Sequence, residues 1–346
     1  MTKAVVGTEP PPADEQARVE DAAARTVAGR SAASRLADAG VTRNLGLVAA
    51  LIILAIVGVV SADTFATTSN VLTVLKNASV IGVVTVGMTF VIMGGGIDLS
   101  VGSLIALASV WSTTVATQSY GATGVWFCAI LVGTITGLVN GVLIAYGRLV
   151  AFIVTLAMLV GARGVAQYMS DQQTQVVKVE AINNIASDTV LGIPILVIIM
   201  VLVFAAGWVL LNLTTFGRRT VAIGGNAEAA RLAGIDVRRH TLLLYGLSGL
   251  CCGIAAVMLS AQANSGSSTN GEFYELDAIA AVIIGGTLLT GGRGTLVGTF
   301  LGVMVFTLIT NLFILNNLAT PIQNIAKGAI IVAAVLLQRR SKEAAT

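Results

Sequence analysis

The sequence predicts an all-α membrane protein, a polytopic bundle of about ten transmembrane helices with broken or short helices at Gly-rich segments. Three observations predict this class. The 346 residues are 55% hydrophobic and only 11% charged, whereas soluble globular proteins are about 25% charged. The apolar residues gather in runs close to the roughly 20 residues that a helix needs to cross a bilayer. The 38 glycines include clusters that lie between these runs.

The composition also excludes several classes of protein. The formal net charge is only +3, and the basic residues lie in clusters beside the apolar runs, so we expect no nucleic-acid partner. Cys128, Cys251 and Cys252 all lie inside apolar runs, which is typical of small core residues and not of a disulfide set or a metal site. The apolar runs leave no room for a soluble catalytic domain.

The composition divides the chain into three parts. Residues 1–44, rich in Ala, Pro, Asp, Glu and Arg, predict a cytoplasmic tail that is disordered or weakly helical. Residues 45–338 predict the transmembrane domain, which includes a cytoplasmic loop at 213–240, and residues 339–346 predict a second cytoplasmic tail. The first apolar run lacks the pattern of a signal peptide and is long enough to remain in the bilayer.

Ten apolar segments predict the membrane spans. They lie at 45–62, 79–95, 99–117, 122–147, 149–169, 190–212, 241–262, 276–290, 295–313 and 321–338.

The placement of Lys and Arg predicts the orientation of these spans. With the amino terminus in the cytoplasm, the outside loops hold only Lys76 and Lys178. The inside loops hold Arg43, Arg148, Arg218, Arg219, Arg231, Arg238, Arg239, Arg293, Arg339, Arg340 and Lys342. This bias follows the positive-inside rule, so we expect both termini in the cytoplasm.

The first candidate functional stretch is residues 93–103, which hold Asp98 between two apolar runs. A carboxylate at this depth costs a few kcal/mol unless it is satisfied. Asp98 could cap the helix that follows it. Alternatively, Asp98 and Ser100 could face a translocation path and bind the hydroxyls of a solute. The two roles are compatible. Arg163 and Lys327 also lie inside apolar runs, where we expect snorkelling or pairing in preference to ligand contact.

A second stretch repeats the pattern of the first. Residues 95–103, Gly-Gly-Ile-Asp-Leu-Ser-Val-Gly-Ser, have the same frame as residues 291–299, Gly-Gly-Arg-Gly-Thr-Leu-Val-Gly-Thr. Paired glycine-interrupted segments in two halves of a membrane protein point to a translocation site. Chance recurrence in a glycine-rich chain, or close helix packing, is the alternative explanation. The candidate residues along a path are Asp98, Ser100, Gly95, Gly96, Gly291 and Gly292.

The third stretch, residues 216–236, predicts a short cytoplasmic helix. Asn226 is a good N-cap, Glu228 suits the first turn, residues 227–233 are strong helix formers, and Gly234 suits the end. Such a helix could dock in a groove of a partner protein or could be an inert connector.

Three motifs together resemble one protein family. They are residues 95–102, Gly-Gly-Ile-Asp-Leu-Ser-Val-Gly; residues 223–234, Ile-Gly-Gly-Asn-Ala-Glu-Ala-Ala-Arg-Leu-Ala-Gly; and residues 285–298, Gly-Gly-Thr-Leu-Leu-Thr-Gly-Gly-Arg-Gly-Thr-Leu-Val-Gly. In this order they look like the signatures of the permease subunit of bacterial carbohydrate ABC importers, the ribose/xylose/galactoside type. The resemblance covers nearly all of the chain after residue 44. Where relatives often have Pro-Phe, this chain has Ala151-Phe152.

The resemblance implies a role, a site and a set of partners. The role is the path of a monosaccharide, a pentose or hexose, through the bacterial inner membrane. The short helix would dock in a cleft of a separate ATPase subunit, through Gly225, Asn226, Glu228, Arg231 and Gly234. An extracytoplasmic sugar-binding protein would deliver the cargo. We also expect lipid around the chain and a second permease copy, by default in a homodimer, because an engine of two ATPases needs two docking helices.

Absences in the sequence agree with this assignment. The chain has no GxxxxGK[ST] phosphate loop, so we expect ATP and Mg²⁺ to bind the partner ATPase and no cofactor to bind this chain. The sole histidine, His240, lies beside Arg239 and pairs with no nucleophile, so we expect no enzyme activity in this chain.

Two other functions remain possible from the residues alone. An ion- or proton-coupled secondary transporter would usually carry several embedded ionisable groups, whereas Asp98 is the only embedded carboxylate that the sequence predicts. A scaffold or passive channel would need neither an ATPase nor a binding protein.

Overall fold

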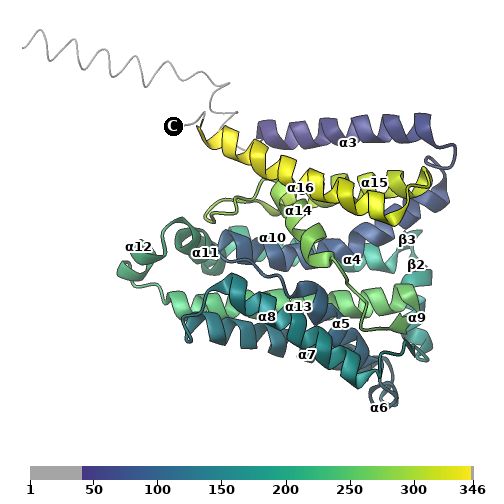
Figure 1. Ribbon diagram of the computed structural model, residues 1–346, viewed down its shortest axis with the longest axis horizontal. Helices are drawn as coiled ribbons and strands as arrows, with labels where there is room; N and C mark the ends of the chain where they lie inside the picture. The colour runs from purple at the N-terminus through teal and green to yellow at the C-terminus, as the bar shows by residue number, and fades with distance from the viewer. Residues whose placement is uncertain (1–40, 344–346) are drawn as a thin grey trace, which may run out of the picture. The chain divides into compact units, whose positions relative to one another are not determined.

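The computed structural model describes residues 41–343, with side chains described for residues 44–336 (Figure 1). The chain divides into the units Met1–Gly46 and Leu47–Thr346, and the features discussed below lie in the second. The tail predicted for residues 1–44 falls outside the described residues up to residue 40, as do residues 344–346. The described residues form fourteen helices and four strands of two residues each, which confirms the all-α fold class.

Seven helices in the described part of the chain are long and apolar enough to cross a membrane. They are α3 (Val41–Ser61), α4 (Thr68–Met93), α7 (Gly121–Ala145), α8 (Ala151–Met169), α10 (Ile195–Leu213), α13 (Val237–Ala263) and α15 (Leu296–Leu315). α4 begins eleven residues before the predicted start at residue 79. The polar residues Asn70, Lys76 and Asn77 interrupt its apolar run, yet the Thr67 side chain caps the helix by accepting a hydrogen bond from the N–H of Asn70.

The other three predicted spans are shorter than expected. α5 (Val101–Ser112) has 12 residues and α14 (Tyr274–Ile284) has 11, about half of what a bilayer requires. α16 (Thr320–Glu343) is apolar as far as Leu336. The estimate of ten spans therefore corresponds to seven long helices and three shorter ones.

Each of the two half-length helices follows a non-helical segment. Residues 94–100 precede α5, and residues 264–273 precede α14. The starts of these helices meet at Gly102 and Gly271, where a Cβ atom added to either glycine would overlap or crowd the carbonyl oxygen of the other. Such half-length helices, buried among other helices, are typical of the discontinuous spans of transporters.

The centre of the bundle is built on α13, which packs against α7, α4 and α5. α7 and α13 approach closely at small residues: a Cβ atom added to Gly249 would overlap the Gly133 carbonyl oxygen and lie 3.0 Å from the Gly137 Cα. Close packing of small residues is a main source of helix association within membranes. Large apolar side chains are instead exposed along α3, α8 and α10.

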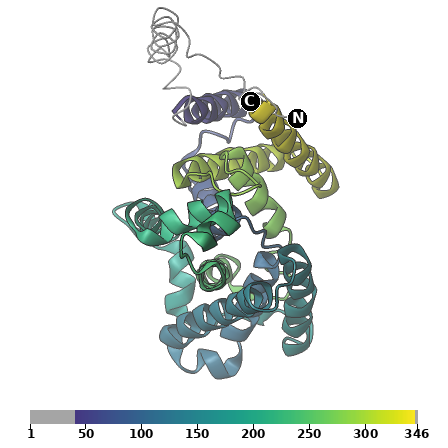
Figure 2. The same ribbon diagram turned by 90° about the vertical axis from the view of Figure 1, so that its left-hand side faces the viewer.

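Short elements lie at the two ends of the helices. One end carries α11 (Thr215–Gly225) and α12 (Ala227–Leu232), which Figure 2 places toward the viewer. The other carries α6 (Val115–Gln118), α9 (Glu180–Ser187) and two small antiparallel sheets. In the sheets, β1 (Gln175–Val176) pairs with β4 (Ser265–Gly266), and β2 (Thr189–Val190) pairs with β3 (Ile193–Pro194). The β2–β3 hairpin replaces the first turn of the span predicted from residue 190.

Candidate docking helix and translocation site

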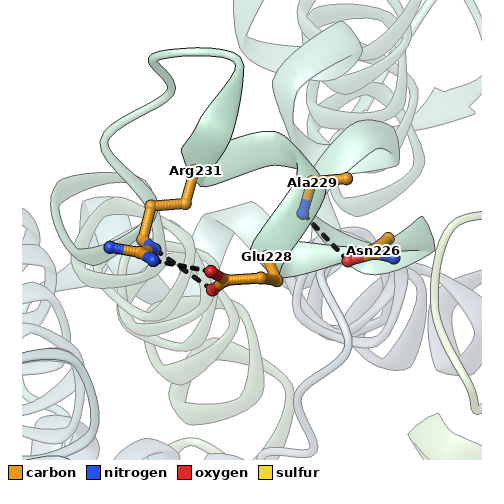
Figure 3. Close-up of polar contacts among 4 residues, drawn as sticks. All are labelled: Asn226, Glu228, Ala229 and Arg231. Atoms are coloured by element: carbon orange, nitrogen blue, oxygen red, sulfur yellow. Dashed lines mark hydrogen bonds and ion pairs between the residues drawn. The ribbon is translucent and has the colours of Figure 1, made fainter.

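A short helix at one end of the bundle carries the residues that the family resemblance assigns to ATPase docking. Asn226 is both the C-cap of α11 and the N-cap of α12, so the two helices follow each other with no linker. The Asn226 Oδ1 atom accepts a hydrogen bond of 3.0 Å from the backbone N–H of Ala229 (Figure 3). The bond satisfies one of the N–H groups that a first helical turn leaves free. The predicted N-cap is confirmed.

Gly234 ends α12 in the way that the sequence predicts. Its φ of +82° lies in the left-handed region that glycine adopts without strain. Its N–H donates to the carbonyl of Arg231, and the N–H of Ile235 donates to the carbonyl of Ala230, each at 3.0 Å. This pair of bonds is the Schellman motif, which satisfies carbonyls at a helix end. α12 is therefore bonded at both ends despite its six residues.

Glu228 and Arg231 form an ion pair on the exposed surface of α12. Arg231 Nη2 donates to Glu228 Oε1 at 2.5 Å, and Arg231 Nε donates to Oε2 at 3.1 Å (Figure 3). Both side chains are 65% exposed. The hydrogen bonds to Arg231 and its charge lower the pKa of the Glu228 carboxyl, and the same contacts raise the pKa of Arg231. The pair stays ionised at neutral pH and presents one positive and one negative group to a partner.

The rest of the α12 surface has one exposed apolar side chain, and its opposite side is buried. Leu232 is 77% exposed and adds a large apolar side chain to the surface that carries the ion pair. Ala230 on the same helix is 5% exposed. Among the described elements, α12 packs chiefly against its neighbours in sequence, α11 and α13. Its outward surface is open to a partner.

α11 is a helix that the sequence interpretation missed. Its three glycines and β-branched residues give it low helix propensity, but its buried side contacts two long helices. The Phe216 ring lies 5.9 Å from that of Phe90 on α4 and 4.5 Å from that of His240 on α13. Thr220 Oγ1 is hydrogen-bonded to His240 Nε2 at 2.8 Å. The spacing of Phe216, Thr220 and Gly224 at every fourth residue was the signal available in the sequence.

Asp98 is fully buried in a hydrogen-bonded cluster. Its Oδ1 atom accepts from the Ser100 N–H at 3.0 Å and from the Ser100 hydroxyl at 2.5 Å, and its Oδ2 atom accepts from the Ser248 hydroxyl at 2.8 Å. Asn140 Nδ2 donates to the Ser100 Oγ atom at 2.9 Å. These four residues are at most 1% exposed. The N-cap of α5 is Ser100, whose side chain makes no capping bond, so Asp98 is not the helix cap that the sequence suggested; its bond to the Ser100 amide, two residues on, is that of an Asx-turn.

The Asp98 cluster links the short helix α5 to two long helices. Asn140 lies on α7 and Ser248 lies on α13, and neither was identified from the sequence. The adjacent Ile97 carbonyl accepts from the Tyr245 hydroxyl at 3.2 Å. The signal for Asn140 and Ser248 in the sequence was weak, because each is one of several polar residues within an apolar helix. In this structure the carboxylate closes a junction of helices, and its place along a path stays a prediction.

The two glycine frames, residues 95–103 and 291–299, meet in space. The Gly292 N–H donates a hydrogen bond of 2.9 Å to the Met93 carbonyl at the end of α4. A Cβ atom added to Gly291 would lie 3.0 Å from the Cα of Gly95. Gly95, Gly291 and Gly292 have φ values of +85°, +84° and +75°. The proximity agrees with a shared site, whereas a common origin by duplication stays a prediction.

Gly224 at the end of α11 joins the same contact. A Cβ atom added there would overlap the Met93 carbonyl oxygen and lie 2.5 Å from the Gly292 nitrogen. The structure thus brings the predicted path residues Gly95, Gly291 and Gly292 beside the helix that leads into α12. Asp98 and Ser100 are bonded to each other in a separate cluster.

The remaining cations within apolar runs have polar partners. Lys327 Nζ on α16 lies 3.0 Å from Asp277 Oδ2 on α14, and Arg163 Nη1 donates to the Ser268 carbonyl at 2.5 Å. Snorkelling or pairing was the expectation for both cations; Lys327 is paired with an acid, whereas Arg163 is bonded to a backbone carbonyl. The Asp277 side chain is only 15% exposed. Asp98 is therefore not the only buried carboxylate, and the sequence interpretation was wrong on that count: Asp277 is the second residue of the span predicted at 276–290 and was not counted as embedded.

In the part of the chain that the structure describes, no three His, Cys, Asp or Glu residues gather in a group that could hold a metal ion. Cys128 is half-buried, Cys251 and Cys252 are buried, and all three are free.

Comparison with known proteins identifies the relatives of this chain. Residues 70–335 match the family model described as the permease component of the branched-chain amino acid transport system. The ribose import permease of Bacillus subtilis is 39% identical over 303 residues, which cover 87% of this chain and 94% of that protein. No solved structure matches the chain.

Permeases for other sugars are also similar. The L-arabinose permease of Azospirillum brasilense is 35% identical over 80% of this chain and 81% of its own length. The galactofuranose transporter permease of Escherichia coli is 33% identical over 77% and 78%, respectively. The similarity to each relative covers most of the membrane-spanning part of the chain.

Proposed function

The chain belongs to the family of branched-chain amino acid transport system permease components, and within this family we propose that its cargo is a monosaccharide, a pentose or a hexose. It is the permease subunit of an ATP-binding cassette importer and a multi-pass protein of the bacterial inner membrane. The observation that carries the choice of cargo is the 33–39% identity to permeases named for ribose, arabinose and galactofuranose.

α12 is the element that binds the ATPase subunit in this proposal. Its two satisfied ends keep a six-residue helix folded outside the bundle. Asn226, Glu228 and Arg231 are exposed beside Leu232, with Gly225 and Gly234 at the boundaries of the helix. An amphipathic helix that projects from a membrane protein suits a groove in a partner. The ATPase supplies ATP and Mg²⁺ binding, because this chain has no phosphate loop.

The translocation path runs along the discontinuous spans. α5 and α14 are half-length helices whose starts meet at Gly102 and Gly271. The path passes Gly95, Gly96, Gly291 and Gly292, and the cluster of Asp98 and Ser100 forms part of its wall. Movement of the ATPase subunits would displace α12 and open these segments to the two sides in turn. Rigid rocking of bundles about broken helices is the way that many transporters alternate access.

Orientation, lipid and a second copy complete the proposal. α11 and α12, with Arg218, Arg219, Arg238 and Arg239 around them, lie on the cytoplasmic side, and both termini lie there as well. Lipid covers the exposed apolar side chains of α3, α8 and α10. An extracytoplasmic sugar-binding protein delivers the cargo at the opposite end. Two copies of the chain provide the two docking helices of one importer.

Proteoliposomes test this function directly. The chain is reconstituted with its ATPase and binding protein, and uptake of radiolabelled ribose, arabinose and galactose is measured with and without enclosed ATP. Leucine is included because of the family's description. We expect ATP-dependent uptake of at least one sugar, no uptake of leucine, and no effect of a proton ionophore. Uptake that needs no ATP and is abolished by the ionophore would favour the secondary transporter instead.

A further inference from the structure

We propose that Gly224 is a positioning residue that transmits movement of the docking helix α12 to both glycine frames at once. The inference rests on the proposed function and adds to it the point at which force from the ATPase enters the membrane-spanning part. The junction is defined as the contact of Gly224 with Met93 and Gly292.

No flexible linker separates α12 from α11. Asn226 belongs to the caps of both helices, and its N–H donates to the Ala222 carbonyl of α11 while its side chain caps α12. A flexible linker would absorb part of any displacement, because its backbone can rotate at several residues. Asn226 is hydrogen-bonded to both helices, so it can absorb little displacement.

α11 is held along its length by contacts with α4 and α13. Phe216 contacts Phe90 of α4 and His240 of α13, and one turn later Thr220 is hydrogen-bonded to His240. Gly224, one further turn on, lies on the same side of the helix. α11 therefore moves as a rigid lever whose end, Gly224 and Gly225, lies beside Gly292.

The junction has no space for a side chain at Gly224. A Cβ atom at Gly224 would overlap the Met93 carbonyl and lie 2.5 Å from the Gly292 nitrogen, and these two groups are hydrogen-bonded to each other at 2.9 Å. The contact is backbone against backbone. Side chains can change rotamer to absorb a shift, but packed backbone cannot do so cheaply.

The junction joins the segments that adjoin the two half-length helices. Met93 is the final residue of α4, and residues 94–100 lead from it into α5. Gly292 lies in the segment between α14 and α15. A displacement of α11 thus reaches the segments beside both half-length helices together. This is the coordination that alternating access requires of two broken spans.

Gly224→Ala tests the inference in the assembled importer. The added methyl group pushes α11 away from Met93 and Gly292. We therefore expect the number of ATP molecules hydrolysed per sugar imported to rise about fivefold or more. Co-purification of the ATPase and basal ATP hydrolysis should be retained. A loss of folded protein alone would lower uptake and hydrolysis together and leave their ratio unchanged. The matched control is Gly161→Ala on α8, where a Cβ atom meets nothing within 4 Å. An unchanged ratio in Gly224→Ala that assembles in wild-type amounts and retains the ATPase overturns the inference.

A distance measurement keeps the inference testable if Gly224→Ala does not assemble. Spin labels are placed at the exposed positions Val221 and Arg293, and in a second protein at Val221 and Leu149, with Cys128→Ala as background. ATP should leave the first distance unchanged and alter the second. A change across the junction as large as that of the second pair contradicts the rigid contact. If the wild type itself imports no sugar with ATP, the proposed function fails, and this failure is separate from either result here.

Discussion

The backbone N–H of Gly292 donates a hydrogen bond of 2.9 Å to the carbonyl oxygen of Met93, although the two residues are far apart in the sequence. The bond joins the end of α4 to the segment that follows α14. Gly292 can take part because its φ of +75° directs its N–H in a way that side-chain-bearing residues seldom adopt. The bond therefore holds the second glycine frame against the end of α4, immediately before the first frame.

Gly292→Ala should destabilise the protein more than a matched glycine replacement. A left-handed φ costs an alanine about 1–2 kcal/mol, and Gly121, with a φ of +67° and nothing within 4 Å of an added Cβ atom, carries that cost alone. At Gly292 the methyl group would also lie 2.9 Å from the Cα of Gly225, and such overpacking costs about 1–3 kcal/mol more. Thermal unfolding in detergent measures both variants. Equal shifts would show that the junction has room for a side chain.

Asp98→Ala should cost more stability than removal of one of its partners. The substitution leaves three buried donors without an acceptor, so we expect a loss of about 3 kcal/mol or more in the free energy of unfolding. Ser248→Ala removes a single bond to the carboxylate and should cost about 1–2 kcal/mol. Denaturant titration of both proteins provides the values. If Asp98→Ala is no worse than Ser248→Ala, the carboxylate does not hold the start of α5.

Breaking the ion pair between Lys327 and Asp277 should be costly, and removing both charges should not be. Lys327→Met leaves the Asp277 carboxylate, 15% exposed, without its partner, which costs about 3–5 kcal/mol for buried pairs. The double variant Lys327→Met/Asp277→Asn has no stranded charge and should recover most of the loss. A double-mutant cycle of unfolding midpoints measures the coupling. A double variant as unstable as Lys327→Met would contradict this role.

Asn226→Ala should weaken binding of the ATPase without lowering the stability of the bundle. Loss of an N-cap costs about 0.5–2 kcal/mol of helix stability, and here that cost falls on ordering α12 in the complex. The dissociation constant should rise about three- to thirtyfold. Asn226→Asp keeps the acceptor oxygen and serves as control. Surface plasmon resonance with the purified ATPase gives the constants, and equal affinities for Asn226→Ala and wild type would remove the cap from the docking account.

The sequence was sufficient to predict the features that depend on local pattern. Runs of apolar residues located the long helices, and the residue types from Asn226 to Gly234 specified both ends of α12. These depend on neighbours within a few residues, so composition and spacing carry the information. The family resemblance, not the physics of single residues, supplied the docking role.

The sequence was insufficient where distant segments decide the structure. α11 is folded by contacts of Phe216 and Thr220 with α4 and α13, which override weak helix propensity. Asp98 is bonded to Ser100 at the start of α5 and to Ser248 of α13, while Asn140 of α7 is bonded to Ser100. No spacing rule connects Asn140 or Ser248 with Asp98. Asp277 was not counted as embedded because it lies at the start of the span predicted at 276–290, and its burial depends on its ion pair with Lys327 of α16, 50 residues away in the sequence.

ATP-dependent uptake by wild type and Glu228→Arg is the most direct test of import driven through α12. The variant replaces the pair with two positive charges on an exposed helix, so folding should be retained. Glu180→Arg, a charge reversal in the first turn of α9 at the opposite end, is the control for ATPase co-purification. We expect Glu228→Arg to lose ATPase co-purification and at least about tenfold in ATP-dependent uptake, which corresponds to about 1.4 kcal/mol of binding. Equal ATP-dependent uptake by wild type and Glu228→Arg, with the ATPase still bound, would contradict the account.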